Sequence, residues 1–266
     1  AYHMIPVKRI ADLFEDMTTY RPSEATVLSL LQTSYEVLEP IETTIAEKLL
    51  QQVVVHADET GCRADGKLNW VHVCSDGGYT YLRVHEKRGE EAFKAIGFLP
   101  EYQGTVVHDC MKSYFKEGCA FSDALCNAHL LRESLGIAKH DGHRWASRMA
   151  ELLREGWKAA LAARAKEENV EPEVIQVFED RYDAILREGE KEWALEEAST
   201  PVSKKGKQKK SKAGNLGERF MLHKEAILLF LRRPEIPFDN NQAERDLRMV
   251  KVKQKVSGAF RTQAGA

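Results

Sequence analysis

A change of hydrophobic periodicity near residue 52 constrains the fold of this chain more than any other feature. Before this point, apolar residues such as Ile10, Leu13 and Phe14 recur at the spacing of one helix face. After it, three runs rich in β-branched and aromatic residues follow one another: VVVHADE (53–59), LNWVHVCS (68–75) and YTYLRVH (79–85). Such runs favour strands. The sequence therefore predicts a sheet that is buried against helices, which is an α/β fold.

The turn-forming residues between these runs predict how the strands are paired. The Asp-Gly-Gly turn at 76–78 predicts a hairpin, while Gly61 and the Asp-Gly pair at 65–66 interrupt the chain between the first two runs. Three further elements are then expected: a helix at 88–98, a buried strand at 104–109, and a strand that continues into a helix at 123–138. This element order is typical of an RNase H-like domain: three antiparallel strands, a helix, and then a strand that lies beside the first strand.

Helical patterns dominate the rest of the chain. Residues 143–235 are expected to form a helical insertion, with a long helix at 217–233 and a Lys-rich loop at 199–217. That loop contains lysines 204, 205, 207, 209, 210 and 212. The predicted segments are an N-terminal helical segment (1–51), the first part of the core (52–142), the insertion (143–235) and a final core helix (236–266).

The N-terminal segment supports two hypotheses. Two helices with a turn at Tyr20–Ser23 fit a helix-turn-helix that reads DNA, but helix pairs of this kind are also common as arms that pack on a core. We favour the packing arm. The chain ends on FRTQAGA without a clear terminal element, so a fragment of a longer protein is expected.

Composition excludes several protein classes. The five cysteines contain no CxxC pair, which argues against a disulfide framework and fits a reducing compartment. No run of eighteen apolar residues occurs and the first ten residues do not resemble a signal peptide, so no membrane association is expected and a cytoplasmic location is predicted. The formal net charge is only −2, but basic residues gather locally after residue 244. Local basic patches bind phosphates even on a neutral protein.

Two aspartates occupy matching positions. Asp58 and Asp109 each follow an apolar run and a histidine, and each is expected at the end of a strand. Adjacent parallel strands that end in this way would place the two carboxylates side by side. Carboxylate oxygens are the ligands that Mg²⁺ prefers. The alternative is that each is an ordinary strand-end or turn residue.

A third carboxylate lies in the motif PFDNNQAERDLR (237–248). Asn241, Glu244 and Arg248 are spaced to share one face of a helix. A carboxylate beside an amide and a guanidinium is typical of a functional site. A surface helix with charge pairs four residues apart would show the same spacing.

Four motifs, in this order, resemble the insertion sequence 66 family of bacterial transposases: HADETG (56–61), VVHDCMKSY (106–114), LCNAHLLRE (125–133) and FDNNQAERDLR (238–248). RPSEAT (21–26) and HEKRGEEA (85–92) extend the resemblance over nearly the whole chain. The resemblance implies an RNase H-like transposase of the DDE type that cuts and joins DNA. It implies that Asp58, Asp109 and Glu244 form the acidic triad and hold two Mg²⁺ or Mn²⁺ ions. It also implies transposon-end and target DNA as partners, and a homo-oligomer in the bacterial cytoplasm.

The pair Cys126-x-x-His129 is interpreted as support for this site. A zinc site would need two more ligands, and His108, Cys110 and Cys119 are the nearest candidates, but their spacing fits no standard zinc template. We therefore predict that Cys126 and His129 lie near the acidic cluster without binding zinc.

Two other functions remain alternatives to a transposase. Another RNase H-like nuclease would share metal-dependent cleavage but would lack the long helical insertion. A non-catalytic DNA-binding protein derived from a transposase would not need all three acidic residues, and all three are present.

Overall fold

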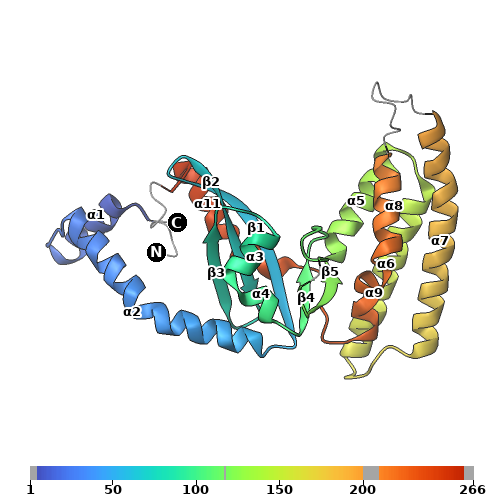
Figure 1. Cartoon of the computed structure of the whole chain (residues 1–266), viewed down its shortest axis with the longest axis horizontal. Coiled ribbons are helices and arrows are strands. Elements are labelled where there is room, and N and C mark those ends of the chain that lie inside the picture. The colour runs from blue at the N-terminus through green and yellow to red at the C-terminus, as the bar shows by residue number, and fades with distance from the viewer. Residues whose placement is uncertain (1–4, 117, 200–209, 261–266) are drawn as a thin grey trace. The chain divides into compact units, whose positions relative to one another are not determined.

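A computed structural model describes residues 5–116, 118–199 and 210–260 (Figure 1). It is a mixed α/β protein whose contacts divide it into two units. The first unit comprises residues 1–104, 116–121 and 241–266, and the second comprises residues 105–115 and 122–240. Among the described residues, no helix combines the length and apolar character needed to cross a membrane.

The first unit contains an antiparallel three-stranded arrangement in the order β1–β2–β3. Asp65 and Gly66 connect β1 to β2 with φ values of 51° and 71°, a conformation that suits a two-residue hairpin turn. The predicted turn at 76–78 joins β2 to β3. The strands span Val54–Ala64 (β1), Lys67–Ser75 (β2) and Thr80–His85 (β3).

Helices cover both faces of these strands. On one face, α3, α4 and the C-terminal end of α2 pack near β3, where Tyr81, Phe98 and Tyr102 form a row of ring contacts. On the other face, α10 and α11 pack against β1 and β2. These helices span Glu24–Leu50 (α2), Glu90–Ile96 (α3), Phe98–Glu101 (α4), Asn241–Asp246 (α10) and Arg248–Ser257 (α11), and α1 (Val7–Thr18) packs against α2.

The second unit joins two parallel strands to a group of helices. β4 (Thr105–His108) pairs with β5 (Ser122–Leu125). Its core contains Trp145, Tyr182 and Phe220, all fully buried, and the Trp145 ring meets the Trp193 ring edge-on at 5.0 Å between centroids. The helices span Asn127–His140 (α5), Arg144–Arg164 (α6), Pro172–Ser199 (α7), Lys212–Leu222 (α8) and Lys224–Arg232 (α9).

Some element boundaries differ from the prediction. β1 continues through Gly61, and Asp58 is paired with Val73 inside the strand instead of ending it. The predicted loop 199–217 is wrong for its last residues, because α8 already begins at Lys212, where the Ser211 hydroxyl caps it by accepting from the Gly214 N–H. Residues 200–209, with four of its lysines, lie outside the described residues. The helix predicted at 217–233 is interrupted at His223.

Candidate active site

Asp58 projects from the face of β1 that the C-terminal helices cover. Side chains alternate between the two faces of a strand, so Asp58 shares a face with Cys62 and Ala64. Cys62 and Ala64 form one buried cluster with Ala243 of α10 and Leu247. The Asp58 side chain is half-buried, and its Oδ1 accepts the Glu59 N–H at 2.8 Å.

Glu244 lies on α10, next to the residue that anchors this helix to the sheet. Ala243 is fully buried against the strands, whereas Glu244 is exposed in the first turn of the helix. Asp58 and Glu244 therefore lie on packed elements of the same unit. Asn241 begins α10 and is also exposed.

The expected single face of Asn241, Glu244 and Arg248 is wrong in one respect. α10 ends at Asp246, and Arg248 is the first residue of α11. The interruption falls at Leu247, which is buried in the core with Val250 of the next turn. Arg248 is exposed at the start of a helix that also carries Lys251, Lys253 and Lys255.

Asp109 belongs to the second unit and follows β4 directly. In the parallel pair, His108 is in register with Leu125, so the residues after each strand, Asp109 and Cys126, adjoin at one edge. The ligand atoms of Asp109, Cys126 and His129 all lie within 4.8 Å of one another. The Asp109 Oδ1 and the His129 Nδ1 are 2.7 Å apart.

Hydrogen-bond partners determine the charge of His129 and the contacts of Cys126. Hydrogen bonds to Asp109 first, and then to Cys126, raise the pKa of His129 to about 10. The imidazole is therefore a cation at neutral pH in the metal-free protein. The buried Cys126 Sγ also accepts a hydrogen bond from the Asn240 N–H at 3.2 Å. Asn240 is the residue immediately before α10.

Three residues that the sequence analysis did not assign to the site hold the backbone around Asp109 and Cys126: His108, Asp123 and Asn127. His108 is fully buried, its Nε2 lies 2.9 Å from Asp123 Oδ1, and its Nδ1 lies 2.6 Å from the Asp109 carbonyl oxygen. Asn127 is buried and donates to the Ile227 carbonyl at 3.0 Å. These contacts fix the backbone on both sides of Asp109 and Cys126. The pairing of His108 with Asp123 follows from strand register, which no local motif reveals.

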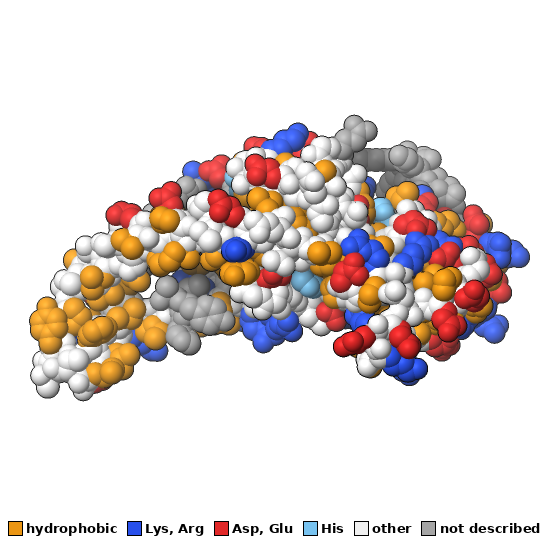
Figure 2. All heavy atoms as spheres, turned by 90° about the horizontal axis from the view of Figure 1, so that it is seen from below, with side chains coloured by type: hydrophobic (Ala, Val, Ile, Leu, Met, Phe, Trp, Pro, Cys, Tyr) orange, Lys and Arg blue, Asp and Glu red, His pale blue; other side chains and the backbone are white. Residues whose placement is uncertain are grey.

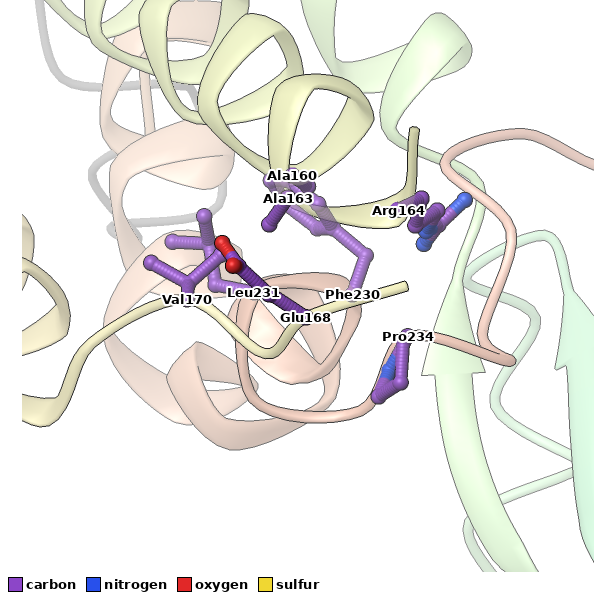
Figure 3. A pocket seen from close by; sticks show the side chains of 8 residues that line it. All are labelled: Ala160, Ala163, Arg164, Glu168, Val170, Phe230, Leu231 and Pro234. Atoms are coloured by element: carbon purple, nitrogen blue, oxygen red, sulfur yellow. The ribbon is translucent and has the colours of Figure 1, made fainter. Parts of the chain in front are cut away.

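A small indentation lies elsewhere in the second unit, between the end of α6 and α9 (Figure 3). Its walls include Ala160, Phe230 and Leu231, with the Arg164 guanidinium at the rim. That guanidinium donates to the Ile236 carbonyl, which ties the loop after α9 to α6. None of the predicted site residues lines this indentation.

One comparison with known proteins is informative. The family model described as "Transposase IS66 family" matches residues 1–266, the whole chain. No curated protein matches the chain.

Proposed function

Because the chain belongs to the IS66 family of transposases, we propose that it is a DDE transposase with an RNase H-like core, which cleaves DNA and transfers strands with the help of divalent metal ions. Membership of this family makes it a DNA-processing enzyme that binds DNA. The finer proposal is that Asp58, Asp109 and Glu244 act together, in a homo-oligomer bound to transposon ends and target DNA in the bacterial cytoplasm.

The observation that carries this proposal is the placement of Asp58 and Glu244 within one unit. Asp58 lies on the face of β1 against which α10 packs, and Glu244 is adjacent to the buried Ala243 of that helix. Carboxylates far apart in the sequence are thus held by a packed strand and helix instead of by mobile loops. Rigid elements are what a metal site requires of its ligands.

The three side chains fit magnesium or manganese. All are carboxylates, the hard oxygen donors that these ions take, and two ions are the usual complement for phosphodiester chemistry. When bound, such ions activate an attacking oxygen and neutralise charge on the phosphate. In our proposal the same residues serve two successive displacements: water releases a 3′-hydroxyl at the transposon end, and that hydroxyl then attacks target DNA.

Cys126 and His129 are proposed to position residues instead of holding zinc. The His129 Nδ1 approaches one oxygen of Asp109 and so orients that carboxylate. The Cys126 Sγ accepts the N–H of Asn240, the residue before the helix of Glu244. Both side chains therefore have partners whose position matters to the proposed triad.

DNA contact is proposed for the exposed cations of α11 and its flanks. Arg245, Arg248, Lys251 and Lys255 are all exposed. Lys and Arg contacts to phosphate supply most of the sequence-independent affinity for DNA. Asn241, exposed on α10, is proposed to contact the substrate beside Glu244.

Activity of substituted proteins tests the proposal. The protein is expressed from its complete gene and given a supercoiled plasmid with the inverted repeats that flank that gene. Asp58→Asn, Asp109→Asn and Glu244→Gln keep size and polarity but remove the charge that holds the ions. Each is expected to reduce cleavage and strand transfer at least about 10³-fold, the scale seen when a group acting in the transition state is removed. DNA affinity should be retained.

Two other carboxylates provide matched controls. Asp246 lies on α10 and accepts from Gln242, while Glu218 is paired with Lys210. Asp246→Asn and Glu218→Gln should keep wild-type activity. If Glu244→Gln retains strand transfer and Asp246→Asn loses it, the third ligand is Asp246 and our assignment of Glu244 is wrong.

A further inference from the structure

Exposed apolar side chains are concentrated on the two N-terminal helices. Of the 27 large hydrophobic side chains that are exposed among the described residues, twelve lie within residues 5–41. Figure 2 shows these orange side chains gathered over α1 and the first part of α2, at the left of the view. They are Ile5, Leu13, Phe14, Met17, Tyr20, Leu28, Leu30, Leu31, Tyr35, Val37, Leu38 and Ile41. We call this surface the arm face.

Part of the arm face lies on one side of α2, and this side of the helix is buried at its two ends. In α2 only Val27 and Leu49 are buried, and Leu31 and Leu38 lie between them at the spacing of one helix side. The first end is buried where α1 packs on α2, and the last where α2 meets β3 and α4. Between these ends, Leu31 is 38% exposed and Leu38 is 51% exposed. The described part of the chain thus covers the ends of this face and leaves its middle open.

The exposed area is large enough for a stable interface. Each of the twelve side chains presents on the order of 100–150 Å² when fully exposed, and they are about half exposed, which gives on the order of 700–900 Å². The largest apolar patch on a monomeric protein is usually about 300–600 Å². One partner in a standard protein–protein interface contributes about 800 Å². The arm face has the area of one half of such an interface.

Charge argues against DNA as the occupant. Residues 5–50 carry four basic side chains and eight acidic ones, a net charge of −4. A surface that binds phosphates shows the opposite balance. The helix-turn-helix hypothesis is therefore disfavoured, and the packing-arm hypothesis holds only for the ends of α2, since Leu28 to Ile41 are largely exposed.

We propose that the arm face binds the arm face of a second copy of this chain. Between Val27 and Ile41, α2 carries two charged residues, and helical spacing places neither beside Leu31 and Leu38. Glu36 lies on the opposite side of the helix, and Glu39 lies about a quarter turn away, at the edge of the apolar side. Two identical faces can then meet about a two-fold axis without like-charge repulsion, as symmetric dimers require. The proposed function includes a homo-oligomer, and the arm face would supply a contact surface between its copies. The dimer inferred here forms without DNA or metal.

Sedimentation equilibrium of the whole chain, with a reductant and a chelator and without DNA, tests the inference. The wild-type protein should be a dimer at micromolar concentration. Leu31→Gln/Leu38→Gln removes two apolar contacts from each copy, and its dimer dissociation constant should rise at least about 100-fold, since every ~1.4 kcal/mol is a factor of ten. Far-ultraviolet circular dichroism should show unchanged helix content, because both side chains are partly exposed in the isolated chain.

The matched control replaces exposed leucines of the other unit. Leu195 and Leu222 are 74% and 78% exposed, so Leu195→Gln/Leu222→Gln makes the same two chemical changes on exposed side chains that do not belong to the arm face. This variant should dimerise like the wild type, and so should Asp58→Asn, whatever the outcome for catalysis. A wild-type chain that is monomeric up to about 100 μM overturns the inference. So does a Leu31→Gln/Leu38→Gln variant that dimerises with wild-type affinity.

Discussion

At the residue scale, His129 gives the clearest pH-dependent prediction. In the metal-free protein its pKa is raised to about 10, first by Asp109 and then by Cys126. A raised folded-state pKa contributes stability that is fully present below the unfolded value of about 6.5 and is lost as pH rises through about 10. The stability advantage of wild type over His129→Gln should therefore be constant below pH 6.5 and shrink between pH 6.5 and 10, as measured by urea denaturation.

Direct titration checks the same contact. In nuclear magnetic resonance spectra recorded with a chelator, His129 should remain protonated at pH 8. A zinc ion held by Asp109, Cys126 and His129 would require a neutral imidazole. A His129 that is neutral at pH 8, or one tightly bound zinc per chain, would contradict our interpretation.

From the sequence, single residues can be proposed for a role where the motif that carries them is local, and these roles stay predictions. Asp58, Asp109 and Glu244 stand out because each lies in a motif of the family, and Cys126 and His129 because they sit three residues apart. The contact of His108 with Asp123 was not predictable, because it depends on the register of β4 against β5. The role of Asn127 was hidden for the same reason: its partner, the Ile227 carbonyl, is 100 residues away.

At the scale of elements, helix packing in the second unit depends on a glycine. A Cβ added to Gly189 of α7 would lie 2.6 Å from Trp145 Cγ and 2.7 Å from Trp193 Cζ3. Gly189→Ala should therefore lower the free energy of unfolding by about 1–3 kcal/mol, the usual cost of overpacking, despite the better helix propensity of alanine. Thermal and urea denaturation measure this change.

Gly136 is the matched control, because it also lies inside a helix but an added Cβ would meet nothing within 4 Å. Gly136→Ala should raise stability by about 0.5–1 kcal/mol. Equal effects of the two substitutions would show that the tryptophan contact does not limit packing.

Element types were predicted well and element ends less well, for physical reasons. Gly61 suggested a break, but it pairs with Trp70 of β2, and the strand continues to Ala64. The Lys-rich segment suggested a loop through 217, but Ser211 caps a helix whose Ala213 and Leu216 are buried. Tertiary burial thus overrides local composition at both places.

At the scale of the whole molecule, DNA binding must arise from local charge, because the net charge is −2. Arg248 is exposed at the start of α11 and is proposed to contact a phosphate. Arg248→Ala should weaken DNA binding and lower the slope of log affinity against log salt by about one. Fluorescence anisotropy across salt concentrations measures both quantities.

The control for this prediction is Arg187→Ala, which removes an exposed arginine from α7 in the other unit. It should leave both the affinity and the salt slope unchanged. If the two substitutions have the same effect, the cations of α11 do not form the DNA-binding surface.

We propose that residues of both units form one active site. Asp58 and Glu244 lie in one unit, and Asp109 lies in the other. The family motifs connect the three, whereas the packing of β1 with α10 explains only the first two. The central claim is therefore that Asp58 and Asp109 hold the same set of metal ions.

A change of metal specificity tests this claim most directly. Asp58→Cys and Asp109→Cys each replace a hard oxygen ligand by a soft thiolate, which Mg²⁺ does not accept and the more thiophilic Mn²⁺ tolerates. Cleavage of the end-bearing plasmid should be lost in Mg²⁺ for both variants and should return in Mn²⁺ to at least about a tenth of the wild-type rate in that metal. Wild-type cleavage in Mg²⁺ by either variant, or Mn²⁺ rescue of one variant and not of the other, would contradict a shared metal site.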